Sequence, residues 1–247
     1  MDTVASRDLA LEYMADAAIA MVHLSRLAEE LVLWSSSEFG FVELADAYST
    51  GSSLMPQKKN QDVPEIVRGK SGRAIGNLVT LLTVLKGLPL TYNRDLQEDK
   101  EPLFDTVETL RDSLEVMAGA IATLDVRGER MAEAASDPML LATDLAEFLV
   151  RAGVPFRDAH EVVGKIVGHV TREGVDLRSL SKGDMQSFHE AFDAGADDLL
   201  DLERSLESRA LAGGTARVRV EASLDEIAAE FATERAEIER LEAEAAQ

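Results

Sequence analysis

Residues 103–124 read LFDTVETLRDSLEVMAGAIATL, and apolar side chains recur along this stretch at steps of three and four residues. The apolar positions are Leu103, Val107, Leu110, Leu114, Met117, Ile121 and Leu124. This spacing places them on one face of an α-helix. The stretch therefore predicts a long helix that packs at a shallow angle in a bundle or coiled-coil-like core.

Two earlier segments show the same periodicity. The first runs from Leu11 to Met21, with Ser6 as a candidate N-cap. The second runs from Val67 to Leu85, and the spacing of Asp62 and Glu65 before it predicts a capping box. We expect the apolar stripes to form core. Three long amphipathic helices have more apolar edge than they can cover for one another, so some stripes are expected to pack between subunits of a homo-oligomer.

The second half of the chain predicts shorter helices. Turn signals delimit helices over about 136–153 and 154–174, and an exposed, acidic amphipathic helix begins at Ser223. Neither an internal repeat nor a strand pair is indicated. We therefore predict an all-α fold, with a long-helix bundle segment over residues 1–130 and a smaller helical C-terminal domain over residues 131–247 that ends in a long terminal helix.

Composition excludes several classes of protein. The 247 residues carry a net charge of −21, which argues against nucleic-acid binding because phosphate neutralisation supplies most of that affinity. The chain has no cysteine, and no apolar run is long enough to span a membrane, so we expect a cytoplasmic protein. The excess of acids is typical of salt-loving organisms or of an ordinary acidic cytosolic protein. We expect no cofactor and no metal, since none of the histidines has metal-ligand spacing: His23, His160, His169 and His189.

Residues 51–61, GSSLMPQKKNQ, form a polar, locally cationic loop. The window 51–100 contains eight basic and five acidic residues, a net charge of +3, in an otherwise acidic chain. Such a cationic region can concentrate a ligand that bears carboxylates. The loop leads into the helix expected near Asp62, where free N–H groups and the helix dipole favour anions. Serine, lysine and asparagine at this place could stabilise the negative charge that develops when a neighbouring C–H is deprotonated.

The segment Gly51–Asn60 resembles the signature loop of the fumarase/aspartase superfamily of lyases. Residues 86–100, KGLPLTYNRDLQEDK, are similar to the argininosuccinate lyase family in particular. Further matches are Phe41–Thr50, Ala142–Ala146, residues 155–161 and Gly213–Ala216. The resemblance covers nearly the whole chain. It implies the β-elimination of argininosuccinate to arginine and fumarate, in arginine biosynthesis, by a homotetramer.

The resemblance implies catalytic roles for Ser52, Lys58, Asn60 and Glu65. Ser52 matches the family's proposed base, which removes a proton next to a succinyl carboxylate to give an aci-carboxylate. A serine hydroxyl is a poor base unless nearby positive charge activates it, and Lys58 could supply that charge. Lys58 and Asn60 match residues that stabilise the dianion. Glu65 matches a glutamate that pairs with a histidine from the earlier half of the subunit, although helix capping explains Glu65 equally well.

The resemblance also implies that Tyr92, Gln97 and Lys100 contact the substrate. Taken singly, Tyr92 could be a packing residue and Gln97 a turn residue, but their joint spacing with Lys100 favours binding. We interpret Ser53 as a structural hydrogen-bonding residue and Lys59 as a solvated lysine.

The chain departs from the family pattern in two ways. It begins partway along a family subunit, so the upstream residues that complete the active site are missing. A separate polypeptide supplies this N-terminal half, or Met1 is an artificial start, or the chain is inactive. Gln61 stands where the family usually has proline. Two other functions remain open: a catalytically incomplete helical assembly protein of the same fold, and a superfamily lyase that acts on adenylosuccinate, aspartate or malate.

Overall fold

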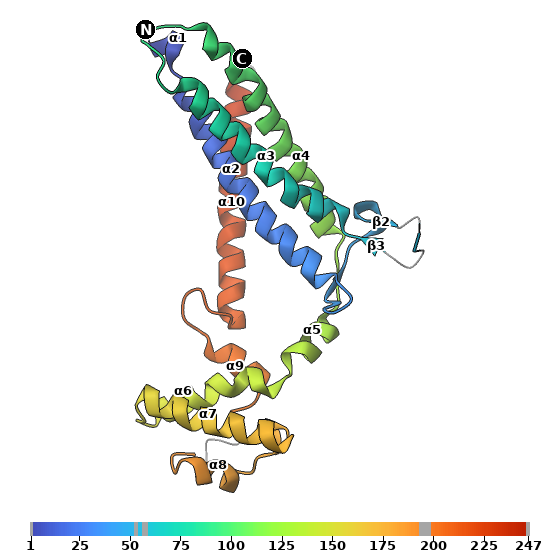
Figure 1. Cartoon of the computed structure of the whole chain (residues 1–247), viewed down its shortest axis with the longest axis vertical. Coiled ribbons are helices and arrows are strands. Elements are labelled where there is room, and N and C mark those ends of the chain that lie inside the picture. Colours follow the sequence, from blue (N-terminus) through green and yellow to red (C-terminus); the bar gives the residue numbers. More distant parts are fainter. Residues whose placement is uncertain (1, 52–53, 56–58, 193–198, 246–247) are drawn as a thin grey trace. The chain divides into compact units, whose positions relative to one another are not determined.

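The computed structural model describes residues 2–51, 54–55, 59–192 and 199–245. They form two compact units, Met1–Met131 and Ala132–Gln247, and the fold is all-α as predicted (Figure 1). Within the described ranges, no helix is both long enough and apolar enough to cross a membrane.

Long helices dominate the first unit. Its elements are α1 (Asp2–Ala5), α2 (Asp8–Trp34), η1 (Asp46–Tyr48), α3 (Asp62–Leu85), η2 (Arg94–Asp99) and α4 (Lys100–Ala122). Helices α2 and α3 pack along each other, and α4 packs on both (Figure 1). Their shared core is formed by small and flexible side chains, namely Met21, Ala28, Leu31, Val67, Ala74 and Met117. Alanines at the contact allow the helix axes to approach closely.

Helix α4 forms where its periodicity predicts, but its apolar stripe is not the face that packs inside the unit. Of that stripe, Met117 is buried, whereas Leu114 and Ile121 are 48% and 45% exposed. The buried face instead carries Thr106 and Ser113. Their hydroxyls donate to backbone carbonyls one turn earlier, at 2.7 and 2.6 Å, so they can be buried without losing hydrogen bonds. The exposed part of the stripe is not core within the described unit, and its packing between subunits stays a prediction.

The start of α2 also differs from the prediction. Its N-cap is Arg7 rather than Ser6, whose hydroxyl accepts a long hydrogen bond of 3.4 Å from the N–H of Asp8. The side chain of Arg7 points to another element and bonds the carboxylate of Asp99 in η2. This residue therefore links the first turn of α2 to the segment that precedes α4.

The predicted capping box at the start of α3 is absent from the described contacts. The helix begins at Asp62 with Gln61 as N-cap, and no side chain of the described residues caps it. The carboxylate of Asp62 instead accepts a hydrogen bond from the hydroxyl of Thr50, on the other side of the loop. Glu65 contributes its backbone N–H, which donates to the carbonyl of Gln61 at 3.1 Å.

Two short antiparallel strand pairs correct the expectation of no strand pairing. Strand β1 (Val42–Glu43) pairs with β4 (Asp125–Val126), and β2 (Thr50–Gly51) pairs with β3 (Lys59–Asn60). Each strand has two residues, which is too short to give the alternation of apolar and polar residues that predicts a strand. The second pair closes the base of the loop 51–61.

The second unit consists of shorter helices. Its elements are η3 (Pro138–Leu141), α6 (Ala142–Arg151), α7 (Phe156–Glu173), η4 (Leu177–Ser179), α8 (Lys182–Phe188), α9 (Leu202–Ser208) and α10 (Arg217–Ala245), and α5 (Gly128–Ala135) precedes them. Its core includes Leu145, Leu149, Ile166, Leu177 and Phe192. Gly174 ends α7 with a φ of +65°, at the predicted turn. All described side chains of α10 are exposed.

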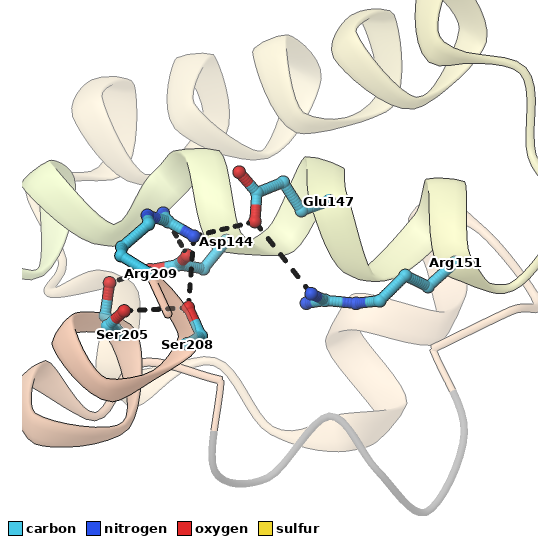
Figure 2. Close-up of polar contacts among 6 residues, drawn as sticks. All are labelled: Asp144, Glu147, Arg151, Ser205, Ser208 and Arg209. Atoms are coloured by element: carbon cyan, nitrogen blue, oxygen red, sulfur yellow. Dashed lines mark hydrogen bonds and ion pairs between the residues drawn. The ribbon is translucent and has the colours of Figure 1, made fainter. Parts of the chain in front are cut away.

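A polar network connects α6 to α9 in the second unit (Figure 2). The Asp144 carboxylate, which is 8% exposed, accepts from Arg209 at 2.7 Å and from the hydroxyl of Ser205 at 2.5 Å. Arg209 also contacts Glu147 at 2.8 Å, and Arg151 approaches the same carboxylate at 3.9 Å. The bond to Asp144 is the main cause that raises the pKa of Arg209 above its usual value. This network fixes the end of α9 on α6.

Candidate active site

The base of the loop 51–61 is ordered by the β2–β3 pair. Thr50 lies opposite Asn60, and Gly51 lies opposite Lys59. Asn60, one of the four residues assigned to catalysis, is partly buried in β3 at the entry to α3. Ser52 and Lys58 lie outside the described residues.

Lys59 takes part in a charge network at the base of the loop. Its ammonium contacts the carboxylates of Asp46 at 2.7 Å and Glu43 at 3.2 Å, and Glu43 also pairs with Arg127. The hydrogen bond to Asp46 is the main cause that raises the pKa of Lys59. The ammonium is thus paired with carboxylates of its own chain, so the interpretation of Lys59 as a solvated lysine is wrong.

A cavity of about 490 Å³ adjoins this network. Its lining includes Ser35, Ser49, Glu43, Gln61 and Arg127. Gln61, the residue that replaces the family's usual proline, donates to the carbonyl of Lys59 at 3.3 Å. The side-chain amide therefore restricts this turn of the backbone by a hydrogen bond, where a proline would have restricted it through its φ angle.

Glu65 lies in the first turn of α3, four residues after Gln61, which lines the cavity, and its side chain is exposed. The pKa of Arg68, on the same helix, is raised mainly by its bond to Glu29 and least by the charge of Glu65. An exposed acid at the start of a helix remains available to a group from outside this unit.

The second group of candidate residues surrounds η2. Tyr92 is 50% exposed, Gln97 is exposed on η2, and Lys100 is the first residue of α4. Thr91, which precedes Tyr92, has a φ of +75°, a region that β-branched residues rarely adopt. Strained backbone of this kind is common beside binding sites, because the surrounding structure must maintain it.

Asp99 is buried beneath this second group. Its carboxylate accepts from the ammonium of Lys100 at 2.6 Å and from the guanidinium of Arg7. Burial acts to raise the pKa of Asp99, but the bonds and charges of Lys100 and Arg7 outweigh it and hold the pKa below its usual value. Sequence reasoning did not single out Asp99 or Arg7, and the one available signal was an acid directly before the motif lysine.

The two groups lie at opposite ends of the same helix (Figure 1). Asn60 and Glu65 are at the start of α3, whereas Tyr92, Gln97 and Lys100 follow its end. The 24 residues of α3 span about 36 Å at 1.5 Å per residue. The structure therefore brings the residues together within each group and keeps the two groups apart within one copy. A small-molecule site that uses both groups must draw them from different copies.

Among the residues that the structure describes, none of the His, Asp and Glu side chains gather into groups of three that could hold a metal ion.

Comparison with known proteins yields two family models and a set of similar sequences. Residues 139–207 match the family model for the argininosuccinate lyase C-terminal region, and residues 1–76 match a lyase model. The chain is 59% identical over 220 residues to the argininosuccinate lyase of Chloroflexus aurantiacus and 52% identical over 229 residues to that of Geobacter metallireducens. These matches cover 89% and 93% of the chain.

The chain belongs to the argininosuccinate lyase family.

The family members are longer than the chain. The matched regions cover 48% and 50% of these two relatives, so the chain spans about half the length of the curated argininosuccinate lyases it matches. The family model at residues 139–207 places this half at the C-terminal part of an argininosuccinate lyase.

Solved structures show the same fold. An EDDS lyase variant with bound fumarate has a TM-score of 0.85 and 31% identity, covering 95% of this chain and 48% of the other. A class II fumarase from Schistosoma mansoni has a TM-score of 0.63 at 21% identity over 78% of this chain and 40% of the other, and supports the fold alone. This argininosuccinate lyase family member therefore has the helical fold of the wider lyase superfamily.

Proposed function

We propose that this chain supplies the C-terminal part of an argininosuccinate lyase, which cleaves argininosuccinate to arginine and fumarate. The identity of 52–59% to proteins named argininosuccinate lyase carries this proposal, because it extends over about nine tenths of the chain and includes both motif segments. The EDDS lyase variant binds fumarate in the same fold, which supports a fumarate-releasing reaction.

In the proposed reaction, the Ser52 side-chain oxygen, deprotonated with the help of the Lys58 charge, takes a proton from the succinyl carbon next to a carboxylate. The electron pair left on that carbon is delocalised into the carboxylate as an aci-carboxylate, and Lys58 and Asn60 stabilise this dianion. The pair then forms the C=C bond of fumarate as the C–N bond breaks, and the departing guanidino nitrogen gains one proton, which balances the proton that Ser52 removed from carbon. Asn60 at the start of α3 supports this role, since donors at a helix N-terminus favour an anion.

The proposed active enzyme is a homo-oligomer, a tetramer by likeness to the family. Two observations support this assembly. The two groups of candidate residues are about a helix length apart in one copy. Apolar side chains also remain exposed along α3 and α4, namely Ile75, Val79, Leu82, Phe104, Val107, Leu114 and Ile121. Packing these stripes against other copies would bury them and bring the start of one α3 near the end of another.

A fumarate-release assay tests the proposal. The chain is mixed with an N-terminal half taken from an argininosuccinate lyase relative, in high salt, and fumarate is followed by its ultraviolet absorbance. We expect release from argininosuccinate, and a loss of on the order of a thousandfold in kcat for Ser52→Ala. Ser53→Ala is the matched control and is expected to retain most of the activity. No release by the wild-type mixture, or equal activity of the two variants, would contradict the enzyme and favour a helical assembly protein.

The likeness to EDDS lyase favours a second candidate, a lyase that releases fumarate from a different amine. At 31–32% identity this likeness is weaker than that to the argininosuccinate lyases. Parallel assays with argininosuccinate, adenylosuccinate and aspartate separate the candidates. The proposed function requires argininosuccinate to have the highest kcat/KM.

A further inference from the structure

A buried carboxylate lies directly behind one of the proposed substrate contacts. Asp99 is 5% exposed. Among the described residues of the first unit, it is the one acidic residue that is buried. The proposed reaction gives it no role. A buried charge is costly unless it is paired and hydrogen-bonded, so its retention at this place calls for a partner.

Asp99 has two such partners, and they approach different oxygens. The Lys100 ammonium contacts Oδ1 at 2.6 Å, and the Arg7 guanidinium contacts Oδ2. The side chain of Arg7 is 18% exposed and that of Lys100 is 58% exposed. The three groups therefore form a row with the buried carboxylate in the middle, between the less exposed cation, Arg7, and the more exposed cation, Lys100.

This row has a net charge of +1, and its excess charge is located at the accessible end. Arg7 neutralises the buried carboxylate, so Lys100 keeps its attraction for an external anion while its ammonium stays hydrogen-bonded. A flexible lysine normally loses much rotamer freedom when it binds a ligand. A lysine that is already held by a fixed carboxylate has lost part of that freedom before the ligand arrives.

The row is held by regular elements of the fold. Leu96 anchors η2 with 2% exposure, α4 begins at Lys100 itself, and Arg7 is the N-cap of α2. The carboxylate is thus fixed between the starts of two long helices. Tyr92 and Gln97 belong to the same exposed segment as Lys100.

We propose that Asp99, supported by Arg7, is a positioning residue that fixes the ammonium of Lys100 for an anionic group of the substrate. The inference rests on the proposed function, because it assigns Lys100 to substrate binding. It adds two residues to the machinery, neither of which touches the substrate.

Kinetics of the complemented enzyme provide the first test. Asp99→Asn is expected to raise the KM for argininosuccinate about tenfold with kcat changed less than about threefold, since a lost ground-state contact appears in KM. Arg7→Met is expected to act in the same direction, and Arg7→Lys to restore the KM to within about threefold of the wild type. A purely structural defect would lower the amount of active enzyme, and hence kcat, at unchanged KM.

A double-mutant cycle sharpens this test. If Asp99 acts through Lys100, adding Asp99→Asn to Lys100→Gln should change the KM by less than about twofold. Independent effects that multiply would overturn the inference. A wild-type mixture that releases no fumarate would instead overturn the proposed function, so the two failures are distinguishable.

A measurement without turnover tests the contact itself. Lysines of the chain are dimethylated with ¹³C, and the Lys100 resonance is assigned by its loss in Lys100→Arg. We expect this resonance to lie outside the envelope of solvated lysines and to move into it in Asp99→Asn. Asp46→Asn, which removes the carboxylate from Lys59 instead, should leave the Lys100 resonance unchanged. A Lys100 signal that is insensitive to Asp99→Asn would refute the proposal.

Discussion

Replacing Arg209 by methionine offers a quantitative test of the network between α6 and α9. The substitution keeps an unbranched apolar stem but leaves Oδ1 of Asp144, in a side chain that is 8% exposed, without its guanidinium. The bond between Ser205 and Oδ2 at 2.5 Å remains. A hydrogen bond to a charged group contributes about 1.5–3 kcal/mol, and the rim contact with Glu147 adds at most about 1 kcal/mol. Because a third of the Arg209 side chain faces solvent, we expect a loss of roughly 2–3 kcal/mol, below the range for fully buried pairs.

Native-state hydrogen exchange of the full chain, read by mass spectrometry on peptides from α6 and α9, measures this loss for the second unit. Arg151→Met is the matched control, because Arg151 reaches the same Glu147 carboxylate from the exposed side at 3.9 Å (Figure 2). We expect the control to cost less than about 0.5 kcal/mol. A double variant, Asp144→Leu with Arg209→Met, should be more stable than Arg209→Met alone, since no buried charge is left unpaired. Equal effects of Arg209→Met and Arg151→Met would refute the reasoning.

Four further predictions follow from single features. Gly214→Ala places a Cβ 2.0 Å from the carbonyl oxygen of Arg209, so we expect it to lower the free energy of unfolding in urea by more than about 2 kcal/mol. As a control, the Cβ of Gly183→Ala would meet only Ser181 Oγ at 3.7 Å and should cause no steric penalty. Thr91→Gly relieves a φ of +75° and should raise stability by about 1 kcal/mol in the same assay; a loss would show that Thr91 is not strained. The pKa of Asp99 is lower in the folded state than in the unfolded state. Its carboxylate therefore contributes stability that is complete above the unfolded pKa near 3.8 and is lost as pH falls through the folded pKa. The difference in Tm between wild type and Asp99→Asn should therefore shrink as the pH is lowered from about 6 to about 3. Raising NaCl from about 0.1 M to about 1 M shortens the Debye length from about 10 Å to about 3 Å. The Tm of this chain, with its net charge of −21, should then rise because the repulsion between its acidic side chains is screened. A Tm that does not change with salt would contradict this prediction.

The sequence predicted the helices well because long helices leave a strong periodic signal. It left open which face of α4 packs inside the unit. An apolar stripe such as that of Leu114 and Ile121 has the same pattern whether it packs within a chain or between chains. The buried Thr106 and Ser113 look polar in sequence, and their compatibility with burial depends on hydroxyl bonds to the preceding turn. The capping box predicted at the start of α3 was wrong because the hydroxyl of Thr50, across the loop, bonds the Asp62 carboxylate.

The candidate site was predictable only as far as its motifs. The roles of Asn60 and Lys100 remain predictions from family resemblance, since neither the fold nor the contacts test them. The pairing of Arg7 with Asp99 left no readable pattern, because the two residues lie far apart in the sequence and meet only in the folded unit. The separation of the two motif groups, by contrast, was implied by the long helix that the sequence predicts between them.

The continuity of α3 also restricts how the chain can change in length. A helix fixes both the distance and the rotational phase of whatever lies at its two ends. Inserting one residue into α3 would shift the η2 segment by about 1.5 Å relative to the loop base and rotate it by about 100° about the helix axis. Insertion of seven residues would nearly restore the phase but lengthen the helix by about 10 Å. Point substitutions on the exposed face of α3 are therefore expected to be tolerated far better than any insertion or deletion within Asp62–Leu85.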